Sequence, residues 1–156
     1  MEHIQRSFTI LIILMLGTLG IGNTVHAQNS GLVTVRSGQE YDQTVESLRQ
    51  MVSKNDMMVM SEINQGKILS MTGLHLKATS LFIGNPTIGN KLFSADRGVG
   101  VAVPVRVNIY EAKDGHTYVS YVKPSQQLAP FSNEQITKIG QQLDQNLNNL
   151  TAMLAK

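Results

Sequence analysis

The stretch at residues 104–123, PVRVNIYEAKDGHTYVSYVK, constrains the fold more than any other part of the sequence. Apolar and polar residues alternate on both sides of KDG, which is the pattern of two strands that each bury one face. A three-residue loop with Gly115 in the left-handed conformation keeps apolar residues opposite apolar residues, whereas a two-residue loop would mix them with polar ones. The predicted cross-strand pairs are Ile109–Val119 and Val107–Tyr121 on one face, and Tyr110–Tyr118 and Asn108–Ser120 on the other.

Hydrophobic periodicity predicts the remaining elements. Apolar residues at spacings of three and four indicate amphipathic helices, and short alternating or β-branched runs indicate strands. Ser132 with Gln135 three residues later predicts a capping box at the start of the last helix. The predicted strands are 32–37, 57–63, 79–83 and 104–112, and the predicted helices are 40–55 and 133–155, with one or two helical turns within 64–73. This order indicates an α+β fold in which helices cover one face of an antiparallel sheet.

Residues 1–27 have the features of a signal peptide. Arg6 precedes the apolar run FTILIILMLGTLGIG, and Val25 and Ala27 fit the small-residue pattern before a cleavage site. The apolar core of about 14 residues is shorter than the roughly 20 that a membrane span needs. We therefore predict cleavage after Ala27, a periplasmic or secreted product, and no stable membrane anchor after cleavage.

The composition of the chain narrows its class. The sequence has no cysteine, so neither a disulfide nor a lipid anchor through cysteine can form. Its formal net charge of +2 comes from scattered Lys and Arg residues, a distribution that does not favour nucleic-acid binding. Residues 28–156 have the length of one domain, and we predict a single α+β domain there.

If helices cover one face of the sheet, the second face is left for solvent, a ligand or a partner. In the predicted register this face mixes aromatic, polar and apolar side chains, which suits either a ligand cleft or a homodimer interface. Cross-strand tyrosine pairing also occurs for stability alone. The residues of this face are Arg106, Asn108, Tyr110, Tyr118, Ser120 and Val122, joined by Phe82, Met58 and Met60 if the neighbouring strands keep the same alternation.

The run GNPTIGN at residues 84–90 predicts a helix start. Asn85 suits the N-cap and Pro86 the first helical position, so a short helix is expected from Thr87 onwards. Its free N–H groups, with Lys91 one turn along, form a candidate anion-binding loop made of Gly84, Asn85, Thr87 and Lys91. The run lacks both the phosphate-loop and the dinucleotide patterns, and capping explains its residues without a ligand.

Two longer runs, SLFIGNPTIGNKLF and VPVRVNIYEAKDGHTYVSYVKP, resemble the domain of unknown function family 302. The shared positions are Gly84, Asn85, Pro86, Gly89, Leu92, Pro104, Glu111, Asp114, Gly115, Ser120, Tyr121 and Pro124. The resemblance extends over residues 31–155 and implies a fold similar to the TATA-binding-protein-like α+β class. The chain departs from the family at 62–65, where Glu-Ile-Asn-Gln replaces the Glu-Ile-Asp-His of many relatives. Any chemistry of that histidine is therefore not expected in this chain.

Candidate catalytic and metal-binding residues are sparse. No serine lies in a nucleophile elbow, and His75 and His116 lack ligand spacing to each other or to a carboxylate. The methionines at 51–71 would suit Cu(I), but methionine more commonly fills cores, and alternation places Met57, Val59 and Ile63 on one face of their strand. We therefore expect no metal and no cofactor.

Two classes of function remain. The first is an exported, non-catalytic binding or accessory domain with a small apolar or amphipathic ligand on the second face of the sheet. The second is a structural or interaction protein that closes a homodimer through the same face. An enzyme is the least favoured class.

Overall fold

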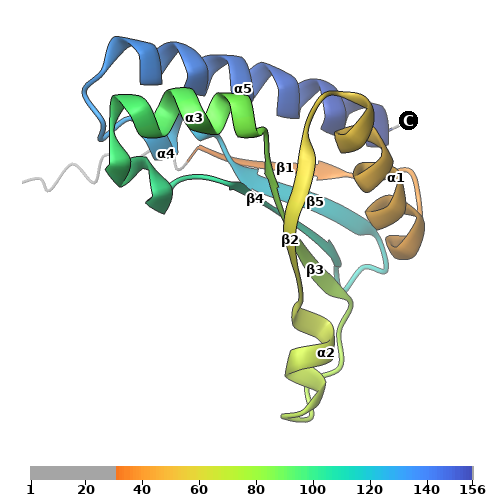
Figure 1. Ribbon diagram of the computed structural model, residues 1–156. Helices are drawn as coiled ribbons and strands as arrows, with labels where there is room; N and C mark the ends of the chain where they lie inside the picture. Colours follow the sequence, from red (N-terminus) through yellow and green to blue (C-terminus); the bar gives the residue numbers. More distant parts are fainter. Residues whose placement is uncertain (1–30, 156) are drawn as a thin grey trace, which may run out of the picture.

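The computed structural model describes residues 31–155, and the predicted signal peptide lies outside them. Within this range five strands form one antiparallel sheet in the order β1-β5-β4-β3-β2 (Figure 1). The strands are β1 (Leu32–Arg36), β2 (Met58–Asn64), β3 (Ala78–Gly84), β4 (Val105–Glu111) and β5 (Thr117–Val122). The two strands of the predicted hairpin, β4 and β5, therefore lie inside the sheet, and β1 and β2 are its edges.

The long helices lie together on one face of this sheet. Figure 1 shows α1, α3 and α5 over that face, while α2 projects from the far end of β2 and β3. The helices are α1 (Tyr41–Lys54), α2 (Gln65–Ser70), α3 (Pro86–Ala95), α4 (Pro124–Leu128) and α5 (Glu134–Leu154), with a 3₁₀ turn η1 (Arg97–Val101). The predicted α+β class is confirmed. In the described part of the chain, none of the helices combines the length and apolarity that crossing a membrane requires.

The hairpin has the predicted register. Tyr110 pairs with Tyr118 and Ile109 with Val119. Gly115 has a φ of +78°, the left-handed conformation that the three-residue loop requires. The pattern of residues at this turn was therefore sufficient to predict how the two central strands align.

Of the two predicted helix starts, that of α3 is confirmed and the predicted cap of α5 is wrong. The Ile88 N–H donates to Asn85 Oδ1 at 3.0 Å, and Pro86 is the first residue of α3, as predicted. The predicted capping by Ser132 is wrong, because Asn133 caps α5 and accepts from two N–H groups of the first turn. Asn is at least as good a cap as Ser, and it lies directly before the first helical residue. The short elements η1 and α4 were not predicted, because so few residues carry no recognisable period.

A β-bulge changes the alternation of β2. Its pairing with β3 shifts between Val59 and Ser61, so one extra residue, Met60, stands in the edge strand. Beyond the bulge Ile63 pairs with Ser80 and lies on the face opposite the helices. The expectation that Ile63 shares the face of Val59 is therefore wrong, because a bulge moves each later side chain to the other face.

Two groups of buried side chains form the core. The larger lies between the sheet, α1 and α5, and the smaller lies between α3, η1, α4 and α5. The larger group includes Leu48, Val52, Leu81, Ile83, Val107, Ile109, Val119, Leu147 and Leu150. The smaller group consists of Leu92, Val99, Ala102, Leu128, Ile136, Ile139 and Leu143. α5 contributes to both, so it joins the sheet to the α3 end of the molecule.

Candidate functional site

The sheet face opposite the helices, here called the open face, gathers the residues predicted for a ligand or interface. Arg106 pairs with Phe82 across β4 and β3, and Tyr110 pairs with Tyr118 across β4 and β5. Asn108 lies between Arg106 and Tyr110 on the same face of β4, because side chains two residues apart in a strand share a face. The structure therefore places these five side chains on one face of three neighbouring strands, and their role stays a prediction.

The two tyrosines form a stacked pair at the turn end of this face. Their ring centroids are 5.8 Å apart with an interplanar angle of 23°. The Tyr118 hydroxyl donates to Asp114 Oδ2 at 2.8 Å, and this bond raises the pKa of Tyr118. The pKa of Asp114 is lowered, first by the backbone N–H of His116 and then by the Tyr118 hydroxyl. The Asp114 carboxylate in the loop thus anchors the Tyr118 ring.

A polar groove of about 370 Å³ lies on the open face, and its lining residues Asn108 and Ser120 are each two positions along their strand from a residue of the tyrosine pair. Strands β3, β4 and β5 and the short helices α2 and α4 supply its polar lining. These polar residues are Gln65, Ser80, Arg106, Asn108, Ser120 and Gln127. A chain of hydrogen bonds forms its floor: Gln65 Nε2 donates to Ser80 Oγ, which donates to Asn108 Oδ1 at 3.4 Å. Gln65 Oε1 is buried and has no hydrogen-bond partner among residues 31–155. The Gln65 amide therefore leaves one acceptor unsatisfied beneath the groove.

Arg106 is the cation of this groove. It is exposed, and none of the ion pairs found in the described part of the chain involves it. The guanidinium presents several N–H donors in a fixed plane, a geometry that matches a carboxylate or another planar anion. The open face thus offers an uncompensated positive charge next to aromatic rings.

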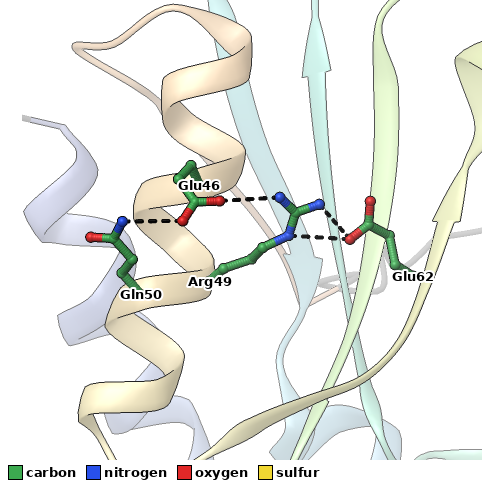
Figure 2. Close-up of polar contacts among 4 residues, drawn as sticks. All are labelled: Glu46, Arg49, Gln50 and Glu62. Carbon is green, nitrogen blue, oxygen red and sulfur yellow. Dashed lines mark hydrogen bonds and ion pairs between the residues drawn. The ribbon is translucent and has the colours of Figure 1, made fainter.

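Glu62, in contrast, serves the fold. Its carboxylate accepts from Arg49 Nη2 at 2.6 Å and from Arg49 Nε at 3.2 Å (Figure 2). Arg49 also pairs with Glu46 at 3.2 Å, and Gln50 donates to the same Glu46 carboxylate. The Glu62 bond raises the pKa of Arg49, and the Gln50 bond is the main cause of the lowered pKa of Glu46. This network ties α1 to the edge strand β2, and it places no charge on the open face.

The histidines and carboxylates considered for a metal are not brought together. Arg36 Nη2 donates to His116 Nδ1 at 3.1 Å, and Lys77 pairs with Glu111 at 2.8 Å. His75 is exposed. Residues 31–155 contain no group of three or more His, Asp or Glu side chains placed to hold a metal ion.

The candidate anion-binding loop is placed at the start of α3. Asn85 Oδ1 accepts the Ile88 N–H, and Asn85 Nδ2 donates to the Asp56 carbonyl at 2.6 Å. Thr87 and Lys91 are exposed. The observed contacts are those of a cap that also anchors the preceding turn, and anion binding by this loop stays a prediction.

The same loop borders an apolar pocket that no sequence pattern had indicated. This pocket, here called the α3 pocket, has a volume of about 140 Å³ and lies between α3, α5 and the adjoining ends of β3 and β4. Gly84, Asn85 and Gly89 line it, together with apolar side chains from both core groups. The two glycines were a usable signal, since a glycine within a helix or strand often marks a close approach.

Comparisons with known proteins identify the family. Proteins from Brucella suis biovar 1 (strain 1330) and Brucella abortus biovar 1 (strain 9-941), both called "Fluoride-specific ion channel FluC 1", are 31% identical to this chain over 98 residues. That stretch is 62% of this chain and only 39% and 36% of the two relatives. The crystal structure of an uncharacterized conserved protein from Bacillus stearothermophilus has the same fold. It has a TM-score of 0.74 and 17% identity, over 80% of this chain and 98% of that one. Residues 33–154 match the family described as "Domain of unknown function DUF302", and the chain belongs to that family.

Proposed function

We propose that this domain is a non-catalytic binding or accessory module that holds a small amphipathic ligand on its open face. The observation that carries the proposal is the position of Arg106, an uncompensated cation that lines a polar groove and pairs across the strands with Phe82, on the face that also carries the tyrosine pair. A ligand pocket typically combines apolar surface with a few polar groups that fix the orientation. The open face has this combination.

The chemistry of the groove favours a ligand with an anionic or carbonyl group at one end. Arg106 supplies the positive charge. Asn108 supplies the N–H donors of its amide, because the bond from Ser80 engages only the amide oxygen Oδ1. Phe82, Tyr110 and Tyr118 lie outside the groove lining but on the same face of the sheet, where Phe82 pairs with Arg106, and their rings suit an apolar body. A short aliphatic or aromatic carboxylate satisfies both requirements.

An accessory role has separate support from the Brucella relatives. The matched stretch makes up less than half of those proteins, which are called fluoride-specific ion channels. In those longer chains a similar stretch is only one part of the protein. By analogy, we propose that this domain assists a separate partner protein. The leader-like residues 1–27 support a periplasmic or secreted place of action, which cell fractionation with an intact C-terminal tag tests directly.

A homodimer is the second candidate, because the open face also exposes apolar side chains. Met58 is 48% exposed and Ile63 is 40% exposed, and both lie on this face near Phe82. Two copies that meet through these residues and the tyrosine pair would remove apolar surface from water. Ligand binding and dimerisation compete for the same side chains.

Octanoate is a suitable probe for the binding function. Titration of the purified protein, followed by amide NMR, is expected to shift residues of β3, β4 and β5 on the open face. Arg106→Gln should weaken binding by roughly tenfold or more, because it removes a charge-assisted hydrogen-bond donor. Arg97→Gln, at an exposed arginine in η1, is the matched control. Equal octanoate affinity in the Arg106 and Arg97 variants would contradict the proposal.

Light scattering after size exclusion separates the two candidates. A dimer that Tyr110→Asp converts to a folded monomer supports the interface. A wild-type monomer in which Tyr110→Asp abolishes octanoate binding supports the ligand site. A monomer whose octanoate binding is unaffected by this substitution would argue against both uses of the tyrosine pair.

A further inference from the structure

The α3 pocket lies where the two core groups meet. Ile83 and Leu147 belong to the larger group, and Leu92 and Leu143 to the smaller one, and all four line the pocket. None of the side chains from residues 31–155 that line it carries a formal charge, and Asn85 is the polar residue among them. The Asn85 amide is already bonded to Ile88 N–H and to the Asp56 carbonyl. The pocket therefore presents a carbon surface to whatever enters it.

Two features that lower stability coincide at this place. The pocket of about 140 Å³ leaves apolar side chains from both core groups in contact with open space, and burying such surface would be favourable. Gly89 lines it from within α3, where glycine is a poor helix former. A Cβ added at Gly89 would meet no atom within 4 Å. A larger residue at this single position would improve the helix and occupy open space, so local packing does not explain the glycine.

We infer that the α3 pocket is a second binding site, separate from the open face, and that it takes a small uncharged aromatic molecule. The volume matches one ring, since an apolar cavity of about 150 Å³ is known to hold benzene. Met57 and Met60 both line the pocket, and thioether sulfur makes favourable contacts with aromatic rings. A peptide or helix is too large for this volume, and a charged ligand would lack a partner.

The structure also provides a way in. The Phe93 ring lines the pocket and is 44% exposed, so it stands at the border with solvent. It lies over Gly100, where a Cβ would come within 3.3 Å of two of its ring atoms. On the opposite side Gly84 leaves room for Met60, because a Cβ there would lie 2.8 Å from the Met60 methyl carbon. The bulge in β2 and two glycines thus shape the border of the site.

Benzene is the probe for this site, and the methionine methyl groups report its position. NMR of ¹³C-methyl methionine should show ring-current shifts at Met57 and Met60 on addition of benzene. Met71 and Met153, which are exposed and do not line the pocket, should not shift. Gly89→Leu should weaken benzene binding by roughly tenfold or more, because the added side chain occupies the volume. Gly89→Ala is the matched control, since a single methyl group leaves most of the space.

Two further variants test the α3 pocket. If Gly89→Leu does not fold, Ile88→Phe fills the same pocket from the adjacent position and is judged by the same criterion. Arg106→Gln must leave benzene binding unchanged, which separates this site from the open-face function. The inference is overturned if benzene does not shift the Met57 and Met60 methyl groups. It is also overturned if a folded filling variant binds benzene as tightly as the wild type.

Discussion

The two faces of the sheet carry opposite chemistry although the same strands make both. Phe82 and Ile83 are neighbours in β3, yet Phe82 lies beside the polar groove and Ile83 lines the apolar α3 pocket. The groove offers an uncompensated arginine and the amide of Asn108, whereas the pocket offers carbon and thioether surface. Strand alternation therefore separates the two kinds of side chain, and the helices decide which face of the sheet they cover.

The largest expected difference is in the free energy of unfolding, between two truncations on opposite faces of β4. Ile109 is fully buried, so Ile109→Ala should lower the free energy of unfolding by roughly 2–5 kcal/mol through lost burial and an added cavity. Asn108→Ala, one residue earlier on the open face, should change it by less than about 1 kcal/mol, since its hydrogen bond from Ser80 is long. Urea denaturation measures both. Similar losses in the two variants would show that the open face is packed as part of the core.

A smaller effect is expected from adding one methyl group at two glycines. Gly89→Ala should raise the free energy of unfolding by roughly 0.5–1 kcal/mol, because the helix improves and the Cβ meets no atom. Gly115→Ala should lower it by about 1 kcal/mol, since its φ of +78° strains any residue with a Cβ. Thermal unfolding compares the two. A destabilised Gly89→Ala would mean that the glycine is needed for packing, and it would remove one support for the α3 pocket as a binding site.

The smallest effect concerns protonation at the tyrosine end of the open face. The Asp114 pKa is lowered in the folded state, so its stabilising contribution is present above the unfolded pKa and is lost as the pH falls through the folded pKa. The Tyr118 pKa is raised, so its contribution is present below the unfolded pKa and is lost as the pH rises through the folded pKa. Side-chain ¹³C NMR should show Tyr118 ionising at lower pH in Asp114→Asn than in the wild type. An unchanged Tyr118 titration would mean that the bond to Asp114 does not persist in solution.

Prediction from the sequence succeeded where a pattern is local. The KDG turn specified the β4–β5 register, and Asn85 with Pro86 specified the start of α3, because turn and cap geometry depend on a few adjacent residues. It failed at the β2 bulge, which reversed the face of Ile63, since an inserted residue is visible only in the pairing with β3. It also missed Gln65 in the polar groove, because that side chain reaches Ser80 from the start of α2.

The sequence by itself determined the α+β class, the hairpin register and the side chains that β4 and β5 place on the open face. These depend on alternation and turn chemistry, which act over a few residues. The tertiary structure alone decided that the groove has a floor of Gln65, Ser80 and Asn108, and that the two core groups leave a pocket beside Gly89. Both cavities form between elements distant in the chain, and their size depends on how helices pack on the sheet, which no local pattern encodes.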